Sequence, residues 1–205
     1  MNEFDSKAGT WDENPMHFER SKAIASKMRE MIPIRKHMVA LELGAGTGFL
    51  SLLLKDDLSS ITLLDGSREM VRIMKEKIRH QGIHHIQALL LDLEKDPFQG
   101  KFDIIYSQMV FHHIIDIDGL LRKFYDLLTP GGYLAIADLY PEDGSFHEEP
   151  FTGHRGFDVN VLSGTLLRNH FAGVKAEPCF VIPKSTGEGQ IREYPVFLMV
   201  AQKIS

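Results

Sequence analysis

The segment Val39-Ala-Leu-Glu-Leu-Gly-Ala-Gly-Thr-Gly-Phe-Leu50 joins an apolar strand to a helix through a loop with glycine at positions 44, 46 and 48. Glycine permits positive φ angles and lets a ligand approach the backbone more closely than any Cβ would allow. Open α/β sheets bind their ligands at the carboxyl ends of parallel strands. The segment therefore predicts an α/β domain that holds a nucleotide-like ligand at the turn after this strand.

The glycine spacing separates two classes of ligand. A dinucleotide fingerprint, G-x-G-x-x-G, needs glycine at position 49, where pyrophosphate meets the helix, but the chain has Phe49 there. The strand also carries Glu42, whose charge would repel a pyrophosphate. The pattern Glu42-x-Gly44-x-Gly46-x-Gly48 resembles motif I of the class I S-adenosylmethionine-dependent methyltransferases. The resemblance implies that S-adenosylmethionine is the cofactor, bound by Glu42, Gly44, Ala45, Gly46 and Thr47, and that the acid is tied to its methionine end, often through water.

A second apolar run, Ile61-Thr-Leu-Leu64, ends in Asp65. A carboxylate at the tip of a second parallel strand can accept hydrogen bonds from both ribose hydroxyls, which NAD and S-adenosylmethionine share. Gly66 and Ser67 open the next helix, and Ser67 can cap it. The resemblance places Met70 near the adenine, although packing in the core explains a methionine equally well.

The third apolar strand, Leu89-Leu-Leu-Asp92-Leu93, again ends in an acid. Taken alone, Asp92 would be interpreted as the cap of a helix or of a turn. In the resembling family, an acid at this third position accepts a hydrogen bond from the adenine amino group. The residue that follows it, here Leu93, meets the adenine ring.

The fourth strand lies in the segment from Phe102 to His113, and we expect it to end at Gln108. The resemblance places this end beside the methionine part of the cofactor and its transferable methyl group. The segment from Leu127 to Asp138 resembles the helix, tight turn and fifth strand of the family. Pro130-Gly131-Gly132 is expected to break the helix and form that turn.

Alternating helix and strand signals predict βαβ units and a parallel sheet covered on both faces. The resemblance implies a three-layer, Rossmann-like methyltransferase fold, with a seven-stranded, mostly parallel sheet whose last strand runs antiparallel between the fifth and sixth. Strands are expected near 38–43, 60–64, 85–91, 102–107, 132–138, 176–183 and 195–203, and helices near 48–55, 67–81, 117–128 and 158–171.

We expect one domain over residues 1–205. Its parts are an amino-terminal helical lid (1–35), a cofactor-binding core (38–139), a substrate-side loop (140–157) and a carboxyl-terminal helix with a strand pair (158–205). The apolar stripe of the first part, Phe18, Ile24, Met28 and Met31, fits a lid over the cofactor and packing on the core equally well.

Composition agrees with this reading. A chain of 205 residues that is 43% hydrophobic and 25% charged can bury a full core. A net charge of −5 without a block of Lys and Arg argues against a nucleic-acid-binding protein. No run is apolar enough to span a membrane, and the amino terminus lacks the features of a secretory signal. The single Cys179 suits a reducing compartment, so a cytoplasmic location is expected. Periodicity does not predict the oligomeric state.

The chemistry of methyl transfer needs mainly proximity and alignment, with a general base only where the acceptor must lose a proton. His112, His113 and His147 are candidate bases, because histidine titrates near neutral pH. The loop containing His147, Glu148, Glu149 and His154 lacks a short metal-binding spacing such as H-E-x-x-H, so no metal site is predicted. Ser107-Gln108-Met109-Val110 replaces the Asn/Asp-Pro-Pro-Tyr/Phe pattern of many amino-group methyltransferases, which favours oxygen or carbon acceptors.

The sequence thus predicts an S-adenosylmethionine-dependent methyltransferase that acts on a small molecule. Two alternatives stay open. One is a protein that binds the cofactor without catalysis, as a sensor or the partner of an active subunit. The other is an NAD-dependent oxidoreductase, against which Phe49 and Glu42 argue.

Overall fold

The computed structural model describes residues 4–147, 151–185 and 190–204. The strands are β1 (Val39–Leu43), β2 (Ser60–Asp65), β3 (Ile86–Leu90), β4 (Phe102–Gln108), β5 (Leu128–Leu139), β6 (Phe171–Ser185) and β7 (Ile191–Lys203). The α-helices are α1 (Pro15–Met31), α2 (Phe49–Leu54), α3 (Arg68–His80), α4 (Ile117–Leu127) and α5 (Val159–Arg168), and two short 3-10 helices are η1 (Ala8–Glu13) and η2 (Phe111–His113).

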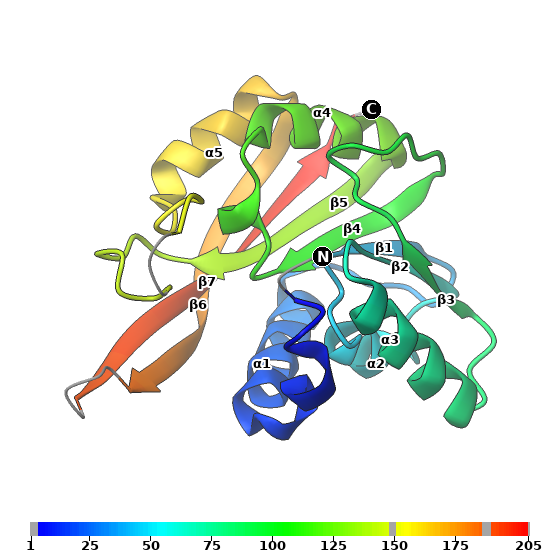
Figure 1. Cartoon of the computed structure of the whole chain (residues 1–205). Coiled ribbons are helices and arrows are strands. Elements are labelled where there is room, and N and C mark those ends of the chain that lie inside the picture. The colour runs from blue at the N-terminus through cyan, green and yellow to red at the C-terminus, as the bar shows by residue number, and fades with distance from the viewer. Residues whose placement is uncertain (1–3, 148–150, 186–189, 205) are drawn as a thin grey trace.

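The strands form one seven-stranded sheet in the order β3-β2-β1-β4-β5-β7-β6 (Figure 1). β1 pairs in parallel with both β2 and β4, whereas β7 runs antiparallel to both of its neighbours. The predicted fold class is confirmed, including the antiparallel last strand between the fifth and sixth. The strand order reverses at β1, and this switch point is where an open α/β sheet binds its ligands.

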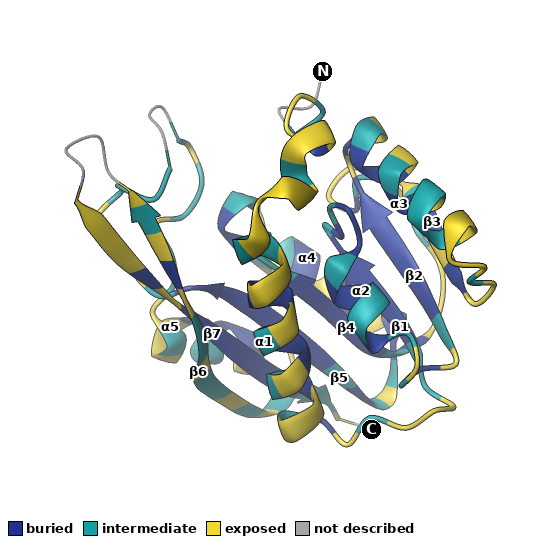
Figure 2. Cartoon of the chain, turned by 90° about the horizontal axis from the view of Figure 1, so that it is seen from below, coloured by how far each residue is buried: buried dark blue, intermediate teal, exposed yellow. Residues whose placement is uncertain are grey.

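Helices cover both faces of the sheet, and each layer has its own apolar cluster. Ile24, Leu50 and Met74 bring α1, α2 and α3 onto one face, while Phe124 and Leu166 bring α4 and α5 onto the other. Figure 2 shows the buried side of α1 turned toward the sheet. The strands between the layers read as near-continuous apolar runs because both of their faces are buried.

The strands of the second half are longer than predicted. β5 begins at Leu128, directly after α4, and the expected tight turn is instead an irregularity inside the strand. Phe102 pairs with Leu128 and Ile104 with Tyr133, and Gly131 takes a φ of 79° within the extra loop of chain. β5 pairs with β4 on both sides of this glycine turn, so the strand continues through residues that the sequence pattern predicts as a break.

β6 and β7 also extend beyond the predicted ranges and pair as far as Ser185 and Ile191. Figure 1 shows this hairpin projecting past the helical layers. Its outer part gains little burial, so the hydrophobic pattern there did not indicate a strand. Within the described ranges, no helix combines the length and apolar character that crossing a membrane requires.

Candidate active site

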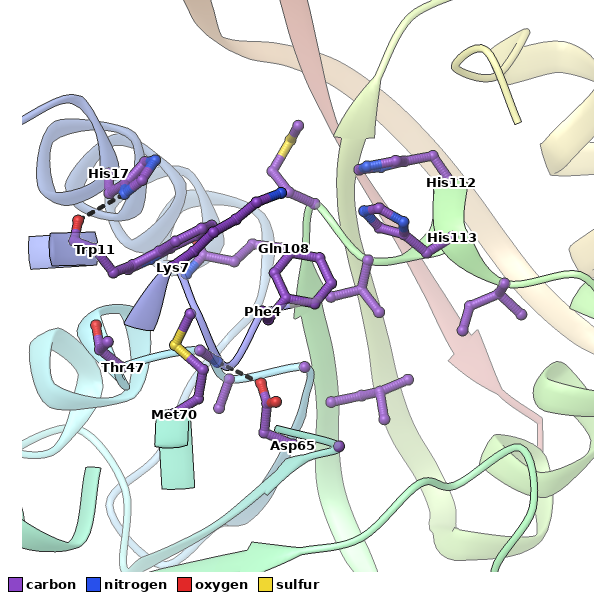
Figure 3. A pocket seen from close by; sticks show the side chains of 18 of the residues that line it. Phe4, Lys7, Trp11, His17, Thr47, Asp65, Met70, Gln108, His112 and His113 are labelled. Carbon is purple, nitrogen blue, oxygen red and sulfur yellow. Dashed lines mark hydrogen bonds between the residues drawn. The ribbon is translucent and has the colours of Figure 1, made fainter. Parts of the chain in front are cut away.

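A pocket of about 660 Å³ opens at the carboxyl ends of β1, β2 and β4. This size is typical of sites for small molecules and cofactors. The loops after these strands form one side, and the amino-terminal segment closes over them (Figure 3). Thirteen of the predicted site residues line it: Gly44, Ala45, Gly46, Thr47, Asp65, Gly66, Met70, Asp92, Leu93, Gln108, His112, His113 and His147.

The loop after β1 has the geometry that its glycines predict. Gly44 takes a φ of 64°, and a Cβ on it would lie 2.3 Å from a methyl group of Val110. Only glycine satisfies both constraints, because other residues are strained at positive φ. At Gly46, the first atom that a Cβ would meet is Nε1 of Trp11, 3.8 Å away. The backbone therefore borders the pocket closely at both positions.

Asp65 stands at the tip of β2 as predicted. Its carboxylate accepts hydrogen bonds of 2.8 Å from the backbone amides of Gly46 and Ser67. Burial raises the pKa of Asp65, and these two donors oppose that effect. Ser67 caps α3 by accepting from the amide of Met70 and donates to Asp5, so its hydroxyl serves local structure and does not line the pocket.

Glu42 is the other predicted residue that does not line the pocket. Its side chain is fully buried beneath α2, where the hydroxyl of Ser51 donates to the carboxyl group. Ser51 in turn lies 2.6 Å from the hydroxyl of Tyr106. Burial raises the pKa of Glu42 to about 8. Successive side chains along a strand point to opposite faces of the sheet, and that of Glu42 points toward the helices. The pocket is bordered instead by the residues that follow Glu42 in the chain.

The remaining predicted residues border the pocket in the expected order. Met70 and Leu93 are buried and supply apolar walls, and Asp92 accepts from Lys95 at 2.6 Å.

Gln108 ends β4 and accepts from the hydroxyl of Ser21 at 3.0 Å. The next residue, Met109, takes a φ of 56°. Such strain in a residue other than glycine is concentrated at functional sites.

The amino-terminal segment closes one side of the pocket. The ring of Phe4 lies 6.3 Å from Trp11 and 5.5 Å from His113, between the two ends of the pocket in Figure 3. The hydroxyl of Thr47 donates to Asp12 at 2.6 Å. Residues of this segment therefore touch both the glycine loop and the histidines, which places the segment where a lid would lie.

Histidines gather at the end of the pocket away from Asp65. His112 is buried, and its Nδ1 donates to Asp138 at 2.7 Å. Burial, and repulsion from neighbouring histidines, lower the pKa of His113 to about 3 and that of His147 to about 4.

His154 instead has its Nε2 2.9 Å from the backbone oxygen of Ile114. Glu148 and Glu149 lie outside the described residues.

Sequence reasoning missed several residues that line the pocket. Arg20 is 8% exposed, its Nε has no hydrogen-bond partner among the described residues, and burial lowers its pKa to about 10. Arg20 lies on the same face of α1 as Ile24 and Met28, at a spacing of four residues. A charged residue in line with the apolar stripe was therefore the signal from which the sequence could have predicted a buried Arg20. Further examples come from segments that are distant in the sequence: Phe4, Lys7, Phe146, Phe151 and Lys184.

Residues 34–175 match the model of a family described as "Methyltransferase domain". The chain is 33% identical over 118 residues to an uncharacterized methyltransferase of Schizosaccharomyces pombe, covering 54% of this chain and 42% of that protein. It is 29% identical over 170 residues to the malonyl-[acyl-carrier protein] O-methyltransferase of Enterobacter lignolyticus, covering 76% of this chain and 64% of that protein. The chain thus spans about half the length of the curated relatives it matches.

Among solved structures, the fold is similar to a chain of the complex between the Haloferax volcanii Trm112 methyltransferase activator and a methyltransferase. The TM-score is 0.81 at 19% identity, and the match covers 100% of this chain and 99% of that chain. At this identity the likeness concerns the fold.

Proposed function

Because the chain belongs to the class I S-adenosylmethionine-dependent methyltransferases, we propose that it transfers a methyl group to an oxygen or carbon atom of an anionic small molecule. The observation that carries this proposal is the continuous pocket that joins the glycine loop and Asp65 to the cluster of histidines. The end lined by Gly44, Gly46 and Asp65, which we call the cofactor end, suits an adenosyl cofactor. The end lined by His112, His113 and His147, which we call the acceptor end, offers room and charge for an acceptor.

The residues of the first end fit the cofactor. Gly44 and Gly46 leave the backbone open to a ligand, and Asp65 presents a carboxylate at a strand tip, where it can accept from ribose hydroxyls. Met70 and Leu93 supply apolar walls for an adenine. We assign the cofactor to these five residues, with its nucleoside at Asp65, Met70 and Leu93. Residues 4–35 would form a lid over it, as part of a single domain.

S-adenosylmethionine, when bound, supplies a methyl group on a positively charged sulfur that leaves readily. The chain's own contribution is to hold the acceptor in line and to keep water out. Gln108, at the end of β4, and the amino-terminal Phe4 and Trp11 border the space between the two ends of the pocket. These side chains are placed to orient the acceptor without taking part in bond making.

The acceptor end favours an anion. Lys7, Arg20 and Lys184 line the pocket, and their positive charges would repel an ammonium group and attract a carboxylate, phenolate or enolate. The low pKa values of His113 and His147 make these groups weak bases, so an acceptor that is already ionised suits them best. A relative named as an O-methyltransferase, the enzyme of Enterobacter lignolyticus, supports oxygen as the acceptor atom.

The test has two steps. Thermal-shift titrations with S-adenosylmethionine, S-adenosylhomocysteine and NADH should raise the melting temperature with the two adenosyl ligands alone, since a ligand that binds only the native state stabilises it. Transfer of a labelled methyl group is then measured over matched sets of small carboxylates, phenols, carbon acids and amines. We expect label in the ionised oxygen or carbon acids.

Two other outcomes have distinct meanings. Label that enters only amines would overturn the choice of acceptor. Adenosyl binding without transfer to any set would favour a protein that binds the cofactor without catalysis.

A further inference from the structure

Three histidines from two separate segments meet at the acceptor end of the pocket. His112 and His113 belong to η2, directly after β4, and His147 comes from the loop after β5. Each offers one ring nitrogen, and these nitrogens lie within 4.8 Å of one another. We propose that His112, His113 and His147 bind a divalent transition-metal ion, with zinc as the preferred ion.

The orientation of His112 is the first argument. Its Nδ1 donates to the fully buried carboxylate of Asp138 at 2.7 Å, which leaves the lone pair on Nε2. Asp138 also accepts from the backbone amide of His112 at 3.2 Å. A carboxylate that fixes the tautomer and the ring of a histidine is the usual outer partner of a metal ligand.

The second argument is the state of the other two rings. Nε2 of His147 is buried and has no hydrogen-bond partner among the described residues, although a buried polar atom is normally paired. The ring of His113 lies 4.2 Å from that of His112 and 5.3 Å from that of His147, measured between centroids. A bound metal ion would supply the partner that Nε2 of His147 lacks, and the ring of His113 is close enough to share it.

The chemistry of the ligands selects the kind of ion. Three imidazoles suit zinc and its neighbours, whereas magnesium and calcium require oxygen ligands. Zn–N bonds of about 2.0–2.1 Å at tetrahedral angles place ligand nitrogens about 3.3 Å apart, so rotation of the His113 and His147 rings would close the cluster. Lys7 and Lys184 also line this end, and their charges oppose a cation. These charges lower the affinity for every divalent cation, so the preference for zinc rests on the three imidazole ligands.

Three protein ligands leave a fourth position open toward the pocket, as in catalytic zinc sites. An anionic oxygen of the proposed acceptor could occupy that position, which would hold it beside the end of β4. This consequence rests on the proposed function, but the binding of the metal ion does not. The sequence predicted no metal because its two segments, Phe111–His113 and the loop with His147, are joined only by the fold.

The experiment measures metal binding directly. The full-length protein is treated with a chelator, dialysed and titrated with Zn²⁺ in competition with a chromogenic chelator, and with Co²⁺ to record the absorption of a coordinated site. We expect one equivalent of metal ion per chain. His113→Ala and His147→Ala should each weaken binding by more than about 100-fold, beyond the about 10–100-fold loss expected for the outer partner in Asp138→Asn.

A histidine on the protein surface, His80, provides the matched control. His80→Ala changes an exposed residue at the end of α3 and should leave affinity and stoichiometry unchanged. Thermal unfolding and binding of S-adenosylhomocysteine verify that each variant is folded, and both are independent of methyl transfer. The absence of a one-to-one site in the parent protein would overturn the proposal, as would equal affinities in the parent and the His113→Ala and His147→Ala variants.

Discussion

The backbone amide of Gly46 donates a 2.8 Å hydrogen bond to Oδ2 of Asp65, a residue 19 positions further along the chain. This bond joins the loop after β1 to the tip of β2, as the dashed line in Figure 3 shows. A second donor, the amide of Ser67, holds the other carboxylate oxygen at 2.8 Å. The carboxylate is therefore oriented before any ligand arrives, which reduces the conformational entropy lost on binding.

Replacing Asp65 tests its assignment to the ribose. We expect Asp65→Ala to weaken binding of S-adenosylmethionine by roughly 1.5–3 kcal/mol, the range for hydrogen bonds to a charged group. Isothermal titration calorimetry measures the change, and Asp56→Ala, at an exposed position near the end of α2, is the control. Undiminished affinity in a folded Asp65→Ala protein would show that the ribose binds elsewhere.

Trp11 is the single tryptophan of the chain and lines the pocket, stacked on His17 with 4.1 Å between ring centroids. Binding of S-adenosylhomocysteine should therefore change its fluorescence emission, because the polarity around an indole controls its emission. The emission change should saturate at the ligand concentration that calorimetry gives. Trp11→Phe removes the signal and serves as the blank. A constant emission during binding that calorimetry detects would contradict the placement of residues 4–35 over the ligand.

Gly44→Ala tests the close approach of the glycine loop to Val110. Alanine at a φ of 64° with a Cβ 2.3 Å from a Val110 methyl group should lose roughly 1–2 kcal/mol to backbone strain alone, and more to the clash. The double variant with Val110→Ala removes the clashing methyl groups but keeps the strain, so it should recover part of the stability. Urea unfolding measures both variants. A double variant no more stable than Gly44→Ala would show that the clash contributes nothing.

Glu42 predicts a pH dependence of stability. Its pKa is raised from 4.5 to about 8, so between these values the folded protein retains a proton that the unfolded chain releases. The stabilisation is complete below the unfolded pKa and is lost as pH rises toward 8, with a slope of up to about 1.4 kcal/mol per pH unit. Glu42→Gln keeps the shape and cannot ionise.

Urea unfolding from pH 5 to pH 8 checks this prediction. The free energy of unfolding of Glu42→Gln should exceed that of the parent protein increasingly as pH rises. Glu19→Gln, at an exposed position on α1, is the control and should follow the parent protein. Parallel pH profiles for Glu42→Gln and the parent would mean that Glu42 is already ionised in the folded protein.

The sequence predicted the sheet and the cofactor end of the pocket because their signals are local. Each strand up to β4 is a short apolar run, and Gly44, Asp65 and Asp92 follow three of these runs within a few residues. Parallel strands bring their carboxyl ends to one edge, so order along the chain was sufficient to place these residues together. The sequence placed Glu42 at the end of β1, but the strand pattern alone does not say which face of the sheet its side chain occupies.

The acceptor end depended on the tertiary structure. The residues of this end come from four separate segments: Arg20 from α1, His113 from η2, His147 from a loop and Lys184 from β6. No sequence pattern in these segments predicts that they contact one another. Their meeting depends on how α1 crosses the sheet and how the chain returns after β5, both of which are set by packing between layers.

By itself, therefore, the sequence determined the α/β class, the family and the edge of the sheet at which Gly44, Asp65 and Asp92 gather, because backbone periodicity and glycine spacing are properties of neighbouring residues. Only the tertiary structure decided that Glu42 faces the helices, that Phe4 and Trp11 reach into the pocket, and that three histidines share one space. Contacts between residues far apart in sequence arise when the apolar layers pack, and no local pattern records them.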